Sequence, residues 1–426
     1  MPDRPRVFVH VGAPKTGTTY VQRLLWGNRE ALAREGVDVP GRGRGEHLEA
    51  GFDLRTEASP ADPKRPMPQW EGAWDRLAAA ARESDKKAVV ISEERLAGAS
   101  AADAERAVAS LAPAEVHIVY TARDLLGLLP TAWQETVKNR STRGFEEWLS
   151  DVFDRGTDGV AGRWFWLVQD AVDVLQRWAK AVPAERVHVI PKPPSSAPAE
   201  LLWERYASVL EIDPGCVDLS TAWANSSLSL EQVEFLRRVN RALGSDFPEW
   251  HYNGFVREVF ARQILLSQVE NWTKPVVPAG YAAKAAEAGE RIIAGLHEAG
   301  YHVVGDLSEL RPAVQAEPQE YVHPDPSEIL DASVNAAAGL LAHVGTMRDQ
   351  RREVQQRLSR LQAELDAERE QRGQAQALAR RSEDRKPGQI VKEALVDLAG
   401  SSRPFAAAYR AYKAVRRRSG SRGSRH

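Results

Sequence analysis

The fold of this 426-residue chain is decided close to its start, by the stretch VFVHVGAPKTGTT at residues 7–19. Residues 7–11 combine β-branched and aromatic side chains, which is typical of a buried strand. From Thr18 onward the apolar residues recur at helical spacing, at Val21, Leu24, Leu25 and Leu32. The stretch therefore predicts a strand, a loop and a helix in that order.

Three more short apolar runs repeat this order along the chain. They are AVVIS at residues 88–92, VHIVY at 116–120 and VHVI at 187–190, each followed by a segment with helical apolar spacing. Strands that alternate with helices are typical of a mostly parallel sheet that is covered on both faces. We therefore predict an α/β fold in which helices flank a mostly parallel sheet.

The composition limits the class of protein. The chain is 43% hydrophobic and 27% charged, so we expect a substantial buried core. Its formal net charge of −2 gives no whole-molecule electrostatic reason to expect nucleic-acid binding. The single cysteine, Cys216, cannot form an internal disulfide, which suits a reducing compartment. No secretory stretch precedes the first strand and no apolar run reaches the ~18 residues that span a bilayer, so we expect a cytoplasmic protein.

The character of the chain changes after the last of the predicted sheet-packing helices. The following segment contains four prolines, Pro312, Pro318, Pro324 and Pro326. We predict four parts: a first domain at residues 1–310, a Pro-rich linker at 311–326, a long helix at 327–385 and a basic tail at 386–426.

The long helix carries an apolar seam with alternating three- and four-residue steps, which is typical of a coiled coil. The seam consists of Met347, Val354, Leu358, Leu361 and Leu365. Arg351 lies on the same seam and Glu368 ends it, so the seam is short and imperfect. Two interpretations stay open: a helix that forms a homo-oligomer through residues 340–368, or a solvated helix.

The basic tail at residues 386–426 mixes Lys and Arg with apolar residues. It also leaves two interpretations open, a disordered tail or an amphipathic helix that binds anionic lipid or an acidic glycan. The second would make the protein peripheral at the membrane. Nucleic acid is the weaker expectation, because the tail has few aromatic residues.

The loop at residues 12–17 has the features of an anion site. A loop that enters a helix N-terminus directs several backbone N–H groups at one point. Gly12 and Gly17 have the separation of the phosphate-loop pattern G-x-x-x-x-G-K-[ST], but Thr18 stands where that pattern has lysine. The lysine instead lies two residues before Gly17, at Lys15. A nucleoside-triphosphate kinase needs its lysine at the helix start, so this loop disfavours one.

With its run PKTGTT at residues 14–19, the loop resembles the 5′-phosphosulfate-binding loop of the sulfotransferases that use 3′-phosphoadenosine 5′-phosphosulfate (PAPS). The resemblance implies a P-loop-type fold over roughly residues 6–310. It also implies that Lys15 contacts the bridging oxygen that becomes the leaving group and stabilises the charge that grows there. Backbone and hydroxyl groups of the next four residues would bind the 5′-phosphate: Thr16, Gly17, Thr18 and Thr19.

A second motif of the same family holds the 3′-phosphate of the donor. It places an arginine at the end of a later strand and a hydroxyl residue, more often serine, eight positions further on. Here the run at residues 116–122 leads into Arg123, and Thr131 lies eight residues later. Arg123 offers a planar fork of donors suited to phosphate, and Thr131 keeps the hydroxyl.

Transfer to a hydroxyl also requires a general base, for which the family uses histidine or glutamate. Laying the family's strand over residues 88–92 puts Glu94 at the position of their histidine, with Glu93 beside it. Carboxylates at the carboxyl end of a parallel strand point into the crevice where such sheets bind ligands. A charged helix start is the alternative for this pair. His47, in a loop predicted after the first helix, is the third candidate, because some relatives present a catalytic residue there.

The sequence therefore predicts a sulfotransferase that moves the sulfuryl group of PAPS to an acceptor hydroxyl and releases adenosine 3′,5′-bisphosphate. We expect the acceptor to be a glycan or glycolipid, with a small phenol or lipid alcohol second. The alternatives are a P-loop nucleotide kinase and a non-catalytic nucleotide-binding scaffold. PAPS is a co-substrate and no metal is expected, because the ten histidines show no paired ligand spacing and one cysteine cannot build a zinc cluster.

Overall fold

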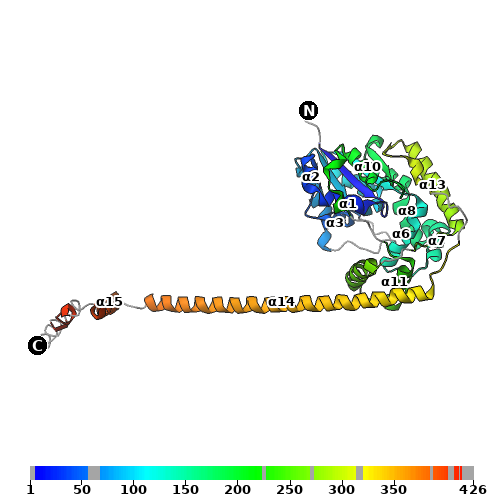
Figure 1. Cartoon of the computed structure of the whole chain (residues 1–426). Helices are drawn as coiled ribbons and strands as arrows, with labels where there is room; N and C mark the ends of the chain where they lie inside the picture. The colour runs from blue at the N-terminus through cyan, green and yellow to red at the C-terminus, as the bar shows by residue number, and fades with distance from the viewer. Residues whose placement is uncertain are drawn as a thin grey trace. The chain divides into compact units, whose positions relative to one another are not determined.

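The computed structural model describes residues 5–55, 68–222, 227–268, 273–312, 320–383, 387–401, 407–411 and 413–414. Within it the chain divides into two compact units, Met1–Leu340 and Leu341–His426. The first unit contains the sheet and the loop at residues 12–17 (Figure 1).

A six-stranded sheet in the order β2-β3-β1-β4-β5-β6 forms the centre of the first unit. Each of its five strand pairs is parallel. The strands are β1 (Arg6–Gly12), β2 (Val37–Asp38), β3 (Ala88–Ser92), β4 (Glu115–Ala122), β5 (Val187–Pro191) and β6 (His302–Val303). The predicted α/β fold with a mostly parallel sheet is confirmed. The sequence pattern missed β2 and β6, because two-residue edge strands are too short to show a periodicity.

Helices connect the strands and cover both faces of the sheet (Figure 1). The helices of this unit are α1 (Thr18–Gly27), α2 (Arg29–Arg34), α3 (Arg44–Leu54), α4 (Ala73–Glu83), α5 (Ala101–Ser110), α6 (Leu125–Lys138), α7 (Phe145–Phe153), α8 (Val160–Gln169), α9 (Ala171–Trp178), α10 (Leu201–Leu210), α11 (Leu230–Leu243), α12 (Glu249–His251) and α13 (Ala279–Ala299). Two other helical segments matter for the site, the 3-10 helix η2 (Glu94–Gly98) and the π-helix η7 (Tyr252–Leu265).

Alternate residues of β1 enter two different cores, because successive side chains of a strand point to opposite faces. Val7 and Val9 belong to the larger core, which includes residues of α4, α5, α6 and α9. Phe8 belongs to the other core, with residues of α1 and α10. Both faces of the sheet are therefore buried, which explains why its central strands read as continuous apolar runs. The carboxyl ends of these parallel strands share one edge, and the candidate site lies there.

Helix α14 (Pro326–Glu383, 58 residues) begins in the first unit and continues through the second. Its first turns pack on the first unit through Ile329 and Ala336, which are both buried. Helix α15 (Pro387–Ser401) follows. The predicted division into domain, linker, helix and tail stays a prediction, and parts of the linker (313–319) and of the tail lie outside the described residues.

No helix in the described part of the chain combines the length and the apolar character that crossing a bilayer requires.

Candidate functional site

The loop at residues 12–17 leaves β1 and ends as the N-terminus of α1. Gly17 caps the helix with a φ of 105°, a region that favours glycine. A Cβ atom at Gly17 would also collide with the side chain of Leu202 on α10. Because α1 begins at Thr18, its first backbone N–H groups have no partner within the helix and face the loop. The loop thus leads directly into a helix N-terminus, and anion binding there stays a prediction.

Lys15 adopts a φ of 70° in this loop, which is uncommon for a residue with a Cβ atom. Its Nζ donates to Glu135 Oε2 on α6 at 2.6 Å, and Nζ of Lys138 lies 2.8 Å from the same oxygen. Arg257 of η7 lies 3.8 Å from the other oxygen of Glu135. Three cations thus surround one carboxylate, and they leave an excess of positive charge beside the loop.

The charge balance of this cluster is visible in its pKa values. Burial alone would raise the pKa of the Glu135 carboxyl, but Lys15 and Lys138 outweigh burial and hold that pKa well below its usual range. Burial, together with the charge of Lys15, lowers the pKa of Lys138 to about 8. The cluster therefore holds several cations around one carboxylate of the protein itself.

The hydroxyl groups of the loop are held by the protein. Thr16 is buried, its Oγ1 donates to the carbonyl of Ala13 at 2.6 Å, and it lies 2.5 Å from Oγ1 of Thr121 on β4. Thr121 in turn donates to the carbonyl of Gly12 at 3.0 Å. The Thr16 hydroxyl thus stabilises the loop, whereas Thr19, in the first turn of α1, is half-buried.

A buried histidine supports the loop from below. His10 of β1 lies 2.8 Å from Ser92 Oγ through Nδ1 and 3.5 Å from Thr121 Oγ1 through Nε2. Burial lowers the pKa of His10 to about 3, so the ring is neutral near pH 7. This network joins the carboxyl ends of three neighbouring strands beneath the loop.

The second predicted motif lies against the first. Nη1 of Arg123, at the end of β4, donates to the carbonyl of Lys15 at 3.4 Å. Asp124 caps α6 by accepting the N–H of Gly127 at 2.5 Å, which fixes the turn after Arg123. Thr131 lies on the second turn of α6, where its hydroxyl donates to the carbonyl of Leu128 at 2.8 Å.

A second cation accompanies Arg123. The backbone N–H of Lys192, directly after β5, donates to the carbonyl of Ala122 at 2.7 Å, which places this residue beside the end of β4. Burial, together with the charge of Arg123, lowers the pKa of the Lys192 side chain to about 8. Two cations held close together without a tight carboxylate partner favour an anion between them.

The two glutamates after β3 lie in different surroundings. Glu94 is half-buried and its Oε2 accepts the hydroxyl of Thr18, the first residue of α1. Glu93 is 3% exposed, and its Oε1 accepts the N–H of Arg95 at 3.1 Å as the cap of η2. Burial, together with the charge of Glu94, raises the pKa of Glu93 to about 7.

His47 lies in helix α3, where the sequence interpretation expected a loop. Its Nε2 donates to the carbonyl of Pro40 at 2.9 Å, and its Nδ1 accepts the N–H of Ser92 at 3.2 Å. The side chain is fully buried, and burial lowers the pKa of its ring. Both ring nitrogens of His47 therefore bind the backbone.

The sequence interpretation gave no role to Glu135, Lys192 and Arg257, and for Lys138 it favoured a solvated face over contact with an anionic donor or acceptor. Glu135 and Lys138 show a signal in their three-residue spacing on a helix, which brings opposite charges together. Lys192 is the first residue after a strand, a position where parallel sheets present ligand-binding groups. Arg257 has no local signal, because η7 reaches the site only through the tertiary fold. Among the described residues, no group of three or more His, Cys, Asp or Glu side chains could hold a metal ion.

No family model and no curated protein matches this chain. A solved structure that resembles it is the crystal structure of a sulfotransferase from Alicyclobacillus acidocaldarius, with 19% sequence identity and a TM-score of 0.37. That match covers 51% of this chain and 85% of the other. A likeness at this level carries no argument about function, so the function has to be argued from the residues of this chain.

Proposed function

We propose that this chain is a sulfotransferase that moves the sulfuryl group of PAPS to an acceptor hydroxyl. One observation carries the proposal: Arg123 donates to the backbone of Lys15, so two cationic sites lie side by side at one edge of the sheet. A nucleotide with a phosphosulfate at one end and a phosphate at the other needs such a pair of sites.

The site beside Lys15 suits the phosphosulfate. Three cations surround Glu135, and Arg257 also lies 3.9 Å from Glu258, so the cluster keeps a positive excess that a bound phosphosulfate would neutralise. The backbone N–H groups at the start of α1 would bind the oxygens of the 5′-phosphate. Thr16, Gly17, Thr18 and Thr19 contribute mainly through these N–H groups, since the hydroxyls of Thr16 and Thr18 already have partners.

Lys15 would support the departing phosphate. The acceptor oxygen attacks sulfur, the bond from sulfur to the bridging oxygen breaks, and its electron pair stays on the phosphate. The ammonium group of Lys15 would leave Glu135 and donate to this bridging oxygen as its charge grows. Glu135 thus holds the lysine in place before the donor arrives.

Glu94 is the favoured base among the three candidates. It contacts Thr18 at the helix start that would hold the 5′-phosphate, so its carboxylate lies beside the expected position of the sulfur. Glu93 has a pKa suited to proton transfer, but its side chain is enclosed. Both nitrogens of His47 are occupied by backbone groups. We expect Glu94→Gln to lower kcat by about 10²- to 10⁴-fold, whereas His47→Gln with unchanged stability lowers it little.

Arg123, Lys192 and Thr131 would bind the 3′-phosphate. The guanidinium and the ammonium supply charge, and the Thr131 hydroxyl can turn from the carbonyl of Leu128 to a phosphate oxygen. This part of the site would distinguish PAPS from adenosine 5′-phosphosulfate and from ATP. The acceptor we propose is a glycan or glycolipid hydroxyl.

Transfer of sulfur-35 from labelled PAPS to a panel of glycans and glycolipids tests the activity. We expect label in at least one acceptor with the intact chain and a loss of about 10²-fold or more with Lys15→Met. The exposed Lys180→Met serves as the matched control and should transfer label normally. Equal labelling by the intact chain and by Lys15→Met would contradict the proposed role of the loop.

A further inference from the structure

An exposed apolar stripe runs along α14 in the second unit. Each of its residues is between 45% and 57% exposed: Val344, Met347, Val354, Leu358, Leu361 and Leu365. They follow steps of three and four residues, so they share one face of the helix. A second helix that packs on this face removes apolar surface from water, which favours association.

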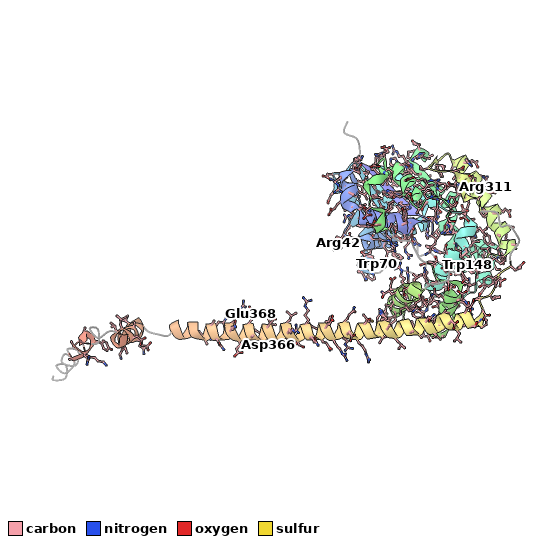
Figure 2. All side chains as sticks on the ribbon, viewed as in Figure 1. Arg42, Trp70, Trp148, Arg311, Asp366 and Glu368 are labelled. Atoms are coloured by element: carbon pink, nitrogen blue, oxygen red, sulfur yellow. The ribbon has the colours of Figure 1, made fainter. Side chains whose placement is uncertain are left out.

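Two charged residues occupy positions of the same stripe. Arg351 lies three residues before Val354, and Glu368 lies three residues after Leu365. From Arg351 to Glu368 the stripe therefore consists of a positive charge, four apolar residues and a negative charge, and Val344 and Met347 precede this part. Asp366, two residues before Glu368, lies on the opposite side of the helix and outside the stripe (Figure 2).

We propose that α14 pairs with α14 of a second copy of this chain in antiparallel orientation, centred between Ser359 and Arg360. In two antiparallel helices, the stripe residues that face each other are equally far from the centre, on opposite sides of it. With this centre, Arg351 of one copy faces Glu368 of the other, and the same pair recurs at the other end. Both charges of the stripe are thereby matched.

The same register also matches the apolar residues. Val354 faces Leu365 of the second copy, and Leu358 faces Leu361. By symmetry these contacts occur twice, which gives four consecutive apolar layers between the two charged ones. A contact between equivalent surfaces of this kind closes as a dimer.

The residues beside the stripe agree with this register. Arg357 of one copy faces Glu364 of the other at two symmetric places, so opposite charges flank the apolar layers. Further from the centre, Arg348 faces Arg369 of the second copy. That contact is exposed to water, and Arg369 already has Asp366 at 3.7 Å in its own chain. The balance of the flanking charges therefore favours the pairing.

Other arrangements leave the charges of the stripe unmatched. A parallel pair would set Arg351 against Arg351 and Glu368 against Glu368 of the second copy. An antiparallel pair shifted by one heptad would set Arg351 against Leu361 or against Ala375. The centred antiparallel pair matches Arg351 with Glu368, although it sets Met347 against Arg372 and Val344 against Ala375. The charges between residues 351 and 368 therefore select the orientation and the register.

Disulfide trapping between full-length chains tests this arrangement. In a Cys216→Ser background, Val354→Cys is placed in a tagged chain and Leu365→Cys in an untagged one. Under mild oxidation of the mixture, the cross-link between unlike chains should form in about half of the dimers, as random exchange dictates. Neither variant should cross-link alone, because equal positions in the two copies lie about 16 Å apart along the axis, beyond the reach of a disulfide.

Gln356→Cys, on the opposite face of α14, is the matched control and should cross-link in no mixture. Cross-linking of Val354→Cys with itself would show a parallel pair and overturn the proposal. A mixture without cross-links, together with the mass of a single chain in sedimentation equilibrium, would overturn the dimer itself.

Charge reversal gives a second measurement with exposed substitutions only. Arg351→Glu sets like charges against each other at both ends and should weaken the dimer by about tenfold or more. Arg351→Glu combined with Glu368→Arg restores the opposite pairs and should recover most of the affinity. A double variant no stronger than the single one would contradict the antiparallel register.

Discussion

The two cationic regions of the candidate site differ in what holds their charges. At the Lys15 region, the carboxylate of Glu135 accepts from Lys15 at 2.6 Å and lies 2.8 Å from Lys138. At the Arg123 region, the guanidinium donates to a backbone carbonyl, and Asp124 is 3.8 Å from its Nε. The protein thus supplies a close anion in the first region and only a distant one in the second.

This difference suggests different roles for the two regions. A lysine held by a carboxylate can move to a stronger anion when charge develops on it, which suits the leaving-group oxygen. A cation without a close anion gains most from the ground-state binding of a phosphate. We therefore expect changes at the Lys15 region to lower turnover, and changes at the Arg123 region to lower affinity and selectivity for the donor.

Within the two cationic regions, the largest expected effect is at Lys15. Lys15→Met removes the donor to the leaving group and should lower kcat by about 10²- to 10³-fold. The dissociation constant of PAPS without acceptor, measured by calorimetry, should change by less than about threefold, because the charge on the bridging oxygen grows only during transfer. A variant that loses affinity and keeps its kcat would reverse the assigned roles.

The free energy of unfolding should depend on pH through the buried carboxyl group of Glu93. Its pKa in the folded protein is about 7 against an ordinary value of 4.5, so between these pH values the native state keeps a proton that the unfolded state has lost. The free energy of unfolding therefore falls as pH rises through this window, by about 3 kcal/mol at most. Glu93→Gln cannot lose that proton and should be more stable than the natural chain at pH 8 and similar at pH 4.5.

Urea unfolding of both proteins at several pH values measures this difference. The exposed Glu105→Gln serves as the control and should follow the natural chain throughout. A difference between Glu93→Gln and the natural chain that does not grow with pH would contradict the raised pKa.

A substitution of Lys192 tests whether the Arg123 region binds the 3′-phosphate. Lys192→Met should weaken the binding of adenosine 3′,5′-bisphosphate by about 10- to 100-fold, the range for hydrogen bonds to charged groups. Binding of adenosine 5′-monophosphate, which lacks the 3′-phosphate, should change little. Calorimetry with both ligands, and with Lys180→Met as the control, separates a lost phosphate contact from a damaged fold. Equal losses for the two ligands would argue against a 3′-phosphate contact.

The smallest expected effect is at Thr131. Thr131→Ala should weaken adenosine 3′,5′-bisphosphate by about three- to tenfold, as expected for one neutral hydroxyl donor. Thr136→Ala is a matched control on the same helix, since its hydroxyl also donates to a carbonyl three residues back, at 2.7 Å. If the two substitutions have the same effect on affinity, Thr131 has no special role.

The sequence predicted the parts of the site that are local in the chain. The spacing of Gly12 and Gly17 lies within one loop, and Arg123 follows a strand directly, so both could be recognised from pattern. Glu135 could not be assigned to Lys15, because the two residues are 120 positions apart and meet only when α6 packs beside the loop. The same limit applies to Lys192. It lies beside Ala122 at the end of β4 only because β4 and β5 are neighbours in the sheet.

The candidate bases show another limit of sequence reasoning. Glu93 and Glu94 are adjacent, and pattern alone did not separate a buried cap from a carboxylate that contacts the helix start. His47 was placed in a loop because glycine and charged residues surround it, but α3 forms there and its ring bridges two backbone groups. Burial decides both cases, and burial is a property of the packed fold.

Calorimetric titration of the intact chain with adenosine 3′,5′-bisphosphate, and with ATP and Mg²⁺, tests the central claim most directly. We expect the natural chain to bind the bisphosphate more tightly than ATP, and Arg123→Ala to lose about tenfold or more of this affinity. The exposed Arg163→Ala should bind as the natural chain does. Preference for ATP, or equal binding of the bisphosphate by Arg123→Ala and the natural chain, would contradict the account.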